Sequence, residues 1–192
     1  MKTSRKTVCL AVITVAFLSV VAAEDSRDEP KDLPEYVGIH RISDDVREQV
    51  NKLQTLDLRA TYLSSIVSSD TTNHSETENS RKASAIRLLG LLKNTNSIST
   101  LISNISFVDV KYGDKPSVDS LAAFGDTAVP HLLHVLENPS ATSTEYQCAV
   151  KALMLIKHAK PRIREWVEFM NEQKGRLSDK AWARLWRYGS VF

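Results

Sequence analysis

The strongest constraint on the fold is a helical spacing of apolar residues that returns in one short segment after another. In the segment Arg81–Lys93, the residues Ala85, Ile86, Leu89 and Leu92 lie three or four positions apart, which places their side chains on one face of an α-helix. The same spacing occurs in seven further segments: 46–67, 98–105, 118–124, 129–136, 149–156, 162–173 and 179–187. Six Gly and six Pro in 192 residues are few for a loop-rich all-β chain. We therefore predict an all-α fold of about eight short helices arranged in pairs.

Two segments leave alternatives open. The first apolar stripe, Val46–Val67, is compatible with one long helix or with two helices joined near Asp57. Either Ser43 or Asp44 is expected to cap its start, since both side chains can accept a hydrogen bond from the first turn. The segment Phe107–Lys115 has a strand-like alternation, but the sequence offers no sheet for it to join.

The boundaries of two later helices are predicted from cap residues. Ser117 is expected to cap a helix over Val118–Phe124, and Gly125 to end that helix in a left-handed conformation. Asp126 is expected to cap the next helix. Pro130 then falls in the first turn of that helix, where its missing N–H costs no hydrogen bond.

The N-terminus has the layout of a secretory signal. Three basic residues in 1–6 precede the apolar run Val8–Val21, and small side chains at Val21 and Ala23 precede the polar Glu24. We predict a signal peptide over residues 1–23, a flexible acidic lead-in over 24–42 and a folded domain over 43–192. The alternative is a retained membrane anchor, but the run is shorter than the ~20 residues that span a bilayer. The predicted protein is exported, either periplasmic or secreted, with no stable membrane span after cleavage.

Charge is unevenly distributed along the predicted mature chain. Residues 24–150 contain 12 basic and 19 acidic residues, whereas residues 151–192 contain 10 basic and 4 acidic residues. The mature net charge is therefore about −1, which argues against nucleic acid as the partner. The basic end suggests a polar surface for another protein, or a complement to the acidic first part.

One stretch carries a family resemblance. Gly125–Leu133 (GDTAVPHLL) resembles a short HEAT repeat of the phycobilin-lyase type, in which the outer helix opens with glycine and an Ala-Val-Pro step before paired leucines. The family's last leucine matches Leu136. Its inner helix matches four further residues: Ala149, Ala152, Leu153 and Ile156. An earlier copy within residues 80–105 keeps Arg81 but has Ser99 where the family usually has proline.

The resemblance implies a short α-solenoid of HEAT-like helix pairs over residues 43–192, and it is clearest over residues 80–158. HEAT-like repeats mostly bind other proteins along a curved face. The lyase members act on chromophore-carrying proteins, so the resemblance also leaves open a lyase-like enzyme or a small-molecule carrier.

Residues that could perform chemistry are sparse. His131, His134 and Glu137 lie at three-residue steps and could share one flank of a helix, with His158 as a further metal ligand. We interpret them as a solvated polar flank and expect no metal and no cofactor. Cys148, the sole cysteine left after signal cleavage, is interpreted as a buried apolar side chain. No catalytic constellation is found, so we predict no catalytic residues and a non-enzymatic protein.

The C-terminal helices carry the residue types that dominate protein interfaces, namely tryptophan, tyrosine and arginine. The candidate partner-binding residues are Arg162, Trp166, Trp182, Arg184, Trp186 and Arg187. The alternative is that the tryptophans close the end of the core beneath a basic polar cap. The sequons at Asn73 and Asn104 are glycosylation sites only in a eukaryotic secretory pathway. We predict an exported scaffold that binds another protein, of unknown identity, through a helical surface.

Overall fold

The computed structural model describes residues 32–69, 75–157 and 163–190. The chain divides into two compact units, Met1–Pro30 and Lys31–Phe192, and every described residue belongs to the second unit. The expected signal peptide (residues 1–23), Arg162, His158 and the sequon at Asn73 all lie outside the described residues. Within the described residues, no helix has the length and apolar character needed to cross a membrane.

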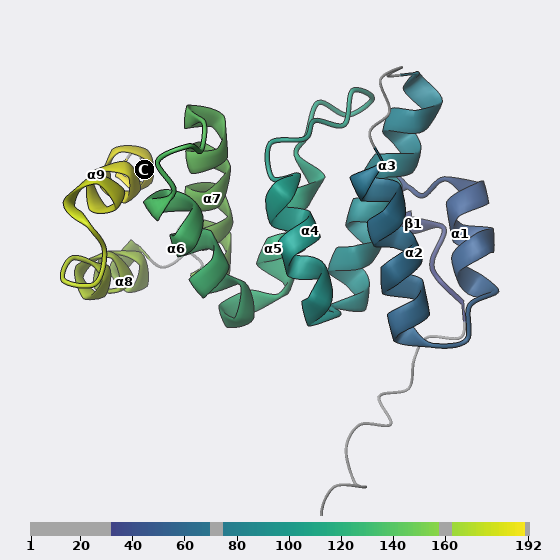
Figure 1. Cartoon of the computed structure of the whole chain (residues 1–192), viewed down its shortest axis with the longest axis horizontal. Coiled ribbons are helices and arrows are strands. Elements are labelled where there is room, and N and C mark those ends of the chain that lie inside the picture. Colours follow the sequence, from purple (N-terminus) through teal and green to yellow (C-terminus); the bar gives the residue numbers. More distant parts are fainter. Residues whose placement is uncertain (1–31, 70–74, 158–162, 191–192) are drawn as a thin grey trace, which may run out of the picture. The chain divides into compact units, whose positions relative to one another are not determined.

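The described residues are mostly helical, as the apolar spacing predicts. They form nine α-helices: α1 (Asp44–Asn51), α2 (Leu56–Ser68), α3 (Glu76–Leu92), α4 (Ile98–Ser103), α5 (Pro116–Ala123), α6 (Val129–Glu137), α7 (Ser143–Ile156), α8 (Ile163–Gln173) and α9 (Asp179–Gly189) (Figure 1). Short 3-10 turns lead into two of them, η1 (Thr95–Ser97) into α4 and η2 (Gly125–Ala128) into α6.

A small β-hairpin precedes the helices. The strands β1 (Tyr36–Val37) and β2 (His40–Arg41) pair antiparallel, and Gly38 takes a left-handed φ of +60° in the turn between them. The flanking residues Leu33 and Ile42 are buried in the helical core. The lead-in expected over residues 24–42 is therefore folded from residue 32 onward.

The first apolar stripe forms two helices rather than one. α1 ends at Asn51, and the hydroxyl of Thr55 accepts a hydrogen bond from the backbone N–H of Leu58 to cap α2. Ser43 occupies the cap position of α1, but its hydroxyl donates to the Asp45 carboxylate and makes no cap hydrogen bond. The break follows from this local capping, which competes with continuation of the helix.

The predicted cap at Ser117 is wrong. α5 begins two residues before the predicted start at Val118, with Pro116 in its first turn and Lys115 at the cap position. The Ser117 hydroxyl instead donates to the backbone carbonyl of Asn104, at 2.8 Å. Ser117 thus ties α5 to the end of α4 rather than capping its own helix.

The next boundary is predicted in part. Gly125 has a φ of +61° directly after α5, and Pro130 lies in the first turn of α6, both as expected. Asp126, however, lies within η2 and does not cap α6. Its carboxylate pairs with the Lys157 ammonium at 2.5 Å, an ion pair between the start of η2 and the end of α7.

Helices pack on neighbours that are close in sequence. α3 packs on α2 and α5, α5 packs on α7, and α7 packs on α9 (Figure 1). α4 packs on α2, α5 and α6, and α6 packs on α7 and α9. The buried apolar side chains of all these helices belong to one continuous cluster.

α3 contains an unbroken run of buried residues. Every residue from Ala83 to Gly90 is buried, because α2 covers one side of the helix and α5 another. α3 and α5 approach closely at Gly90, where an added Cβ would lie 2.7 Å from the Cα of Ser120. The Ser120 hydroxyl donates to the backbone carbonyl of Ile86 at 2.9 Å across the same contact.

Candidate functional site

The predicted binding residue Trp166 lies in the core. Its side chain is 3% exposed, stacks on Phe169 at a ring-centroid distance of 5.4 Å and donates its indole N–H to the carbonyl of Gly189 at 2.9 Å. A side chain that is buried and hydrogen-bonded in this way holds α8 against α9. The assignment of Trp166 to a binding surface is therefore corrected.

The other described candidates lie on α9, and three of them line one hollow. Trp182 is partly buried against the core, whereas Trp186 is 54% exposed. The hollow, of about 570 Å³, lies between α7 and α9. We call it the C-terminal hollow, and it is lined by Ser143, Tyr146, Lys180, Ala183, Arg184, Trp186, Arg187 and Tyr188.

Arg184 and Tyr146 form a fixed part of that lining. The Arg184 guanidinium lies 4.1 Å from the centroid of the Tyr146 ring and donates to the backbone carbonyl of Leu136. The Tyr146 hydroxyl in turn donates to the carbonyl of Asn138 at 2.7 Å. These contacts hold the half-buried Arg184 guanidinium over the buried Tyr146 ring in the lining of the hollow, which is a preorganised arrangement for recognition.

A hydrogen-bond pair positions the start of α9. The Glu137 carboxylate, at the end of α6, accepts from the backbone N–H of Ser178 at 2.7 Å and from its hydroxyl at 2.5 Å. Ser178 also caps α9 by accepting from the N–H of Ala181. These bonds from Ser178 lower the pKa of Glu137 below its ordinary value, while burial opposes them, and Arg184 and His134 lower it further.

The remaining sequence candidates do not assemble a reactive centre in the described part of the chain. His131 and His134 are exposed, and Glu137 is engaged by Ser178. No group of three or more potential metal ligands occurs among the described residues. Cys148 is 2% exposed, with the ammonium of Lys115 at 3.3 Å from its sulfur, so the thiol is enclosed as the interpretation expected.

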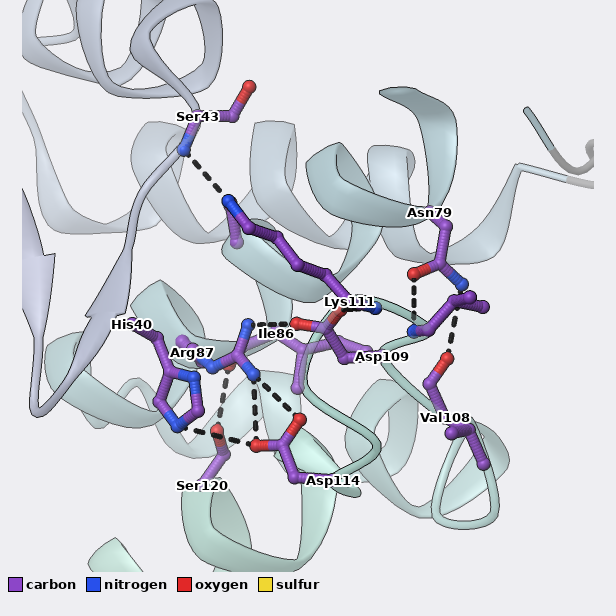
Figure 2. Close-up of polar contacts among 12 residues, drawn as sticks. His40, Ser43, Asn79, Ile86, Arg87, Val108, Asp109, Lys111, Asp114 and Ser120 are labelled. Atoms are coloured by element: carbon purple, nitrogen blue, oxygen red, sulfur yellow. Dashed lines mark hydrogen bonds and ion pairs between the residues drawn. The ribbon is translucent and has the colours of Figure 1, made fainter. Parts of the chain in front are cut away.

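A buried ionic cluster was missed at the sequence level. The Arg87 guanidinium of α3 donates to Asp109 at 2.7 Å and to both carboxylate oxygens of Asp114 at 2.9 Å (Figure 2). His40 of β2 lies 3.4 Å from Asp114 through its Nε2 and meets the Tyr112 ring edge-on. We call Arg87, Asp109, Asp114 and His40 the Arg87 cluster.

The Arg87 cluster explains the segment Phe107–Lys115. The segment is a loop closed by a single bridge between Asp109 and Asp114, and no strand pairs with it among the described residues. Asn79 of α3 holds the loop too, donating to the carbonyl of Val108 and accepting from the N–H of Val110 (Figure 2). The one sequence signal was Arg87 itself, a lone charge within the apolar run of α3.

A second cavity, of about 430 Å³, adjoins the Arg87 cluster. The β-hairpin, α3 and α5 form its walls. Its lining is largely apolar, with charged side chains at Lys93 and Asp119, and comprises Val37, Gly38, Ile39, His40, Arg87, Gly90, Leu91, Lys93, Pro116, Asp119, Ser120 and Ala123. We call it the hairpin cavity.

Comparison of the chain with protein-family models, with curated proteins and with solved structures gives no match. The C-terminal hollow and the hairpin cavity are therefore the candidate functional sites.

Proposed function

We propose that this chain is an exported, non-enzymatic scaffold that binds another protein, built from HEAT-like helix pairs stacked as a short α-solenoid. The packing order supports the solenoid, because α3, α5, α7 and α9 contact one another in series while α4 and α6 pack beside them. In a solenoid each repeat packs on its neighbours, and the outer side chains are left for partners. The basic and apolar pattern of residues 1–23 supports export.

The lining of the C-terminal hollow is the observation that carries the proposal. It presents three cationic side chains, Lys180, Arg184 and Arg187, and no acidic side chain. Lys180 and Arg187 are exposed and form no ion pair with another described residue. Cations gathered at a hollow repel one another, and an anionic partner relieves that repulsion.

The same lining indicates the chemistry of the partner. The exposed ring of Trp186 and the half-buried ring of Tyr188 add aromatic surface to the lining, and Trp, Tyr and Arg side chains carry most of the binding energy at protein interfaces. A protein segment with carboxylates on both sides of an aromatic or aliphatic residue meets both requirements. We therefore propose an acidic, extended segment of another protein as the occupant.

Fluorescence anisotropy with two synthetic peptides tests this proposal. One labelled peptide carries Asp and Glu on both sides of a phenylalanine, and the other replaces these acids with Asn and Gln. The acidic peptide is expected to bind more tightly, and added salt to weaken it by screening exposed charges. Replacing Arg187→Glu is expected to weaken binding at least about tenfold, because the new carboxylate repels the acidic peptide.

The matched control is Lys174→Glu, which makes the same change of charge at an exposed residue outside the lining. It is expected to leave the affinity within about twofold, because separated surface charges are screened. Equal binding of the acidic and neutral peptides, or equal effects of the two substitutions, would contradict the proposal.

A further inference from the structure

The tip of the β-hairpin projects an apolar side chain into solvent. Ile39 is 82% exposed, the highest value among the large apolar side chains described. The left-handed Gly38 and the pairing of Val37 with His40 set the position of this tip. Burial of this exposed isoleucine in an apolar pocket on a partner would remove its side chain from water, which is favourable.

An apolar pocket lies beside that tip. The hairpin cavity has a volume of about 430 Å³, which exceeds the ~150 Å³ cavity that holds a benzene molecule. Its walls include Leu91 of α3, which is 43% exposed, together with Pro116 and Ala123 of α5. The cavity therefore has room for an aliphatic side chain and an apolar wall to receive it.

A projection and a matching cavity on one surface are self-complementary. When a two-fold axis relates two copies, each copy inserts its projection into the cavity of the other, and every contact occurs twice. A surface that had a cavity but no projection would not be self-complementary. In this chain, Ile39 is the projection and the hairpin cavity is the cavity, and Ile39 is itself one of the residues that line it.

The charges at the cavity have the same self-complementary character. Lys93, at the end of α3, and Asp119, on α5, are both exposed and form no ion pair with another described residue. Arg87, the other permanent charge in the lining, is already neutralised by Asp109 and Asp114. Opposite free charges on one surface can pair reciprocally across a two-fold axis, Lys93 of one copy with Asp119 of the other.

We propose that a second copy of this chain occupies the hairpin cavity, forming a symmetric dimer in which the Ile39 tips are exchanged. This inference is independent of the acidic partner at the C-terminal hollow, because the two sites share no lining residue.

Sedimentation equilibrium of the purified chain over a wide concentration range tests the dimer. The wild-type chain is expected to dimerise reversibly. Replacing Ile39→Asp is expected to weaken the dimer at least about 30-fold, the effect of removing an interface hot spot. Because Ile39 is exposed in the single chain, the variant is expected to keep the wild-type circular dichroism spectrum and Tm.

Ile163→Asp is the matched control, since Ile163 is 60% exposed in the first turn of α8, away from the hairpin cavity. It is expected to leave the dimer dissociation constant unchanged. Lys93→Glu alone is expected to weaken the dimer, and the double change Lys93→Glu with Asp119→Lys to restore it. A monomer at every concentration, a small molecule bound in the cavity of a monomer, or a dimer insensitive to Ile39→Asp would overturn the proposal.

Discussion

Two regions of the molecule hold an arginine near a tyrosine ring, but they differ in the groups that the guanidinium meets. In the Arg87 cluster, the guanidinium lies 5.6 Å from the Tyr112 ring centroid, is 6% exposed and meets two carboxylates. In the C-terminal hollow, the guanidinium of Arg184 lies 4.1 Å from the ring of Tyr146 and meets a backbone carbonyl and no described carboxylate. The Arg87 cluster pairs its guanidinium with carboxylates inside the fold, whereas the lining of the C-terminal hollow holds three cations and no acidic side chain.

The difference separates a structural use of arginine from a binding use. A buried guanidinium without carboxylates would carry a large desolvation cost, so loss of a carboxylate from the Arg87 cluster is expected to destabilise the fold. Exposed cations in the C-terminal hollow carry a small cost, because water solvates them until a partner arrives. The Arg87 cluster therefore fixes the loop 107–115 on α3. The cations of the C-terminal hollow are left free to bind an anionic partner.

One of the two largest expected effects comes from opening the Arg87 cluster. Replacing Arg87→Ala leaves Asp109, which is 2% exposed, without its main partner. Loss of one partner of a buried ion pair lowers the free energy of unfolding by about 3–5 kcal/mol. Urea denaturation followed by circular dichroism measures this loss. Replacing Arg187→Ala in the C-terminal hollow is expected to change stability by less than about 0.5 kcal/mol. Similar losses of stability in the two variants would contradict the separation of a structural arginine from a binding one.

The helices could be predicted from the sequence because their signal is local. An apolar spacing of three and four residues lies within a single segment, and it located α3 to α9, although α3 begins five residues before the predicted segment 81–93 and α7 six residues before 149–156. Cap residues were less informative, because Ser117 bonds to Asn104 in another segment. The hairpin at residues 36–41 was missed because its two strands of two residues are too short to show an alternation.

The sites depend on contacts that no local pattern encodes. Arg87 lies 22 residues from Asp109 and 27 from Asp114, so only the folded chain shows which acids it meets. The burial of the tryptophans also depends on contacts between helices. The spacing placed Trp166 and Trp186 on helices, but the packing of α9 against α7 and α8 decides which of them is buried.

Trp166 and Trp186 lie in the same C-terminal region, but their replacement is expected to affect stability very differently. Replacing Trp166→Ala is expected to lower the free energy of unfolding by about 3–5 kcal/mol, because it removes a buried ring and leaves the Gly189 carbonyl without its donor. Replacing Trp186→Ala is expected to change stability by less than about 0.5 kcal/mol, because the side chain is 54% exposed. Thermal unfolding of both variants measures the difference in stability. Binding of the acidic peptide is measured on the same two variants. A Trp186→Ala variant that unfolds as readily as Trp166→Ala would assign both tryptophans to the core.

The smallest effect concerns the carboxylate that holds α9 beside the C-terminal hollow. Hydrogen bonds from Ser178 lower the pKa of Glu137 in the folded chain, so its ionised form favours folding above the ordinary glutamate pKa of about 4.3. That contribution disappears as the pH falls through the lower pKa of the folded state. Replacing Glu137→Gln is therefore expected to lower Tm slightly at neutral pH and not at strongly acidic pH.

Tm measured from neutral to acidic pH tests this prediction, with Glu168→Gln as the control. Glu168 is exposed and pairs with Arg164 on its own helix at 3.0 Å, so its replacement is expected to shift Tm very little at any pH. A Tm difference between wild type and Glu137→Gln that stays constant down to acidic pH would contradict the ionic role of Glu137. The position of α9, and with it the lining of the C-terminal hollow, would then depend on the packing of Ala181 and Leu185 in the core and not on the charge of Glu137.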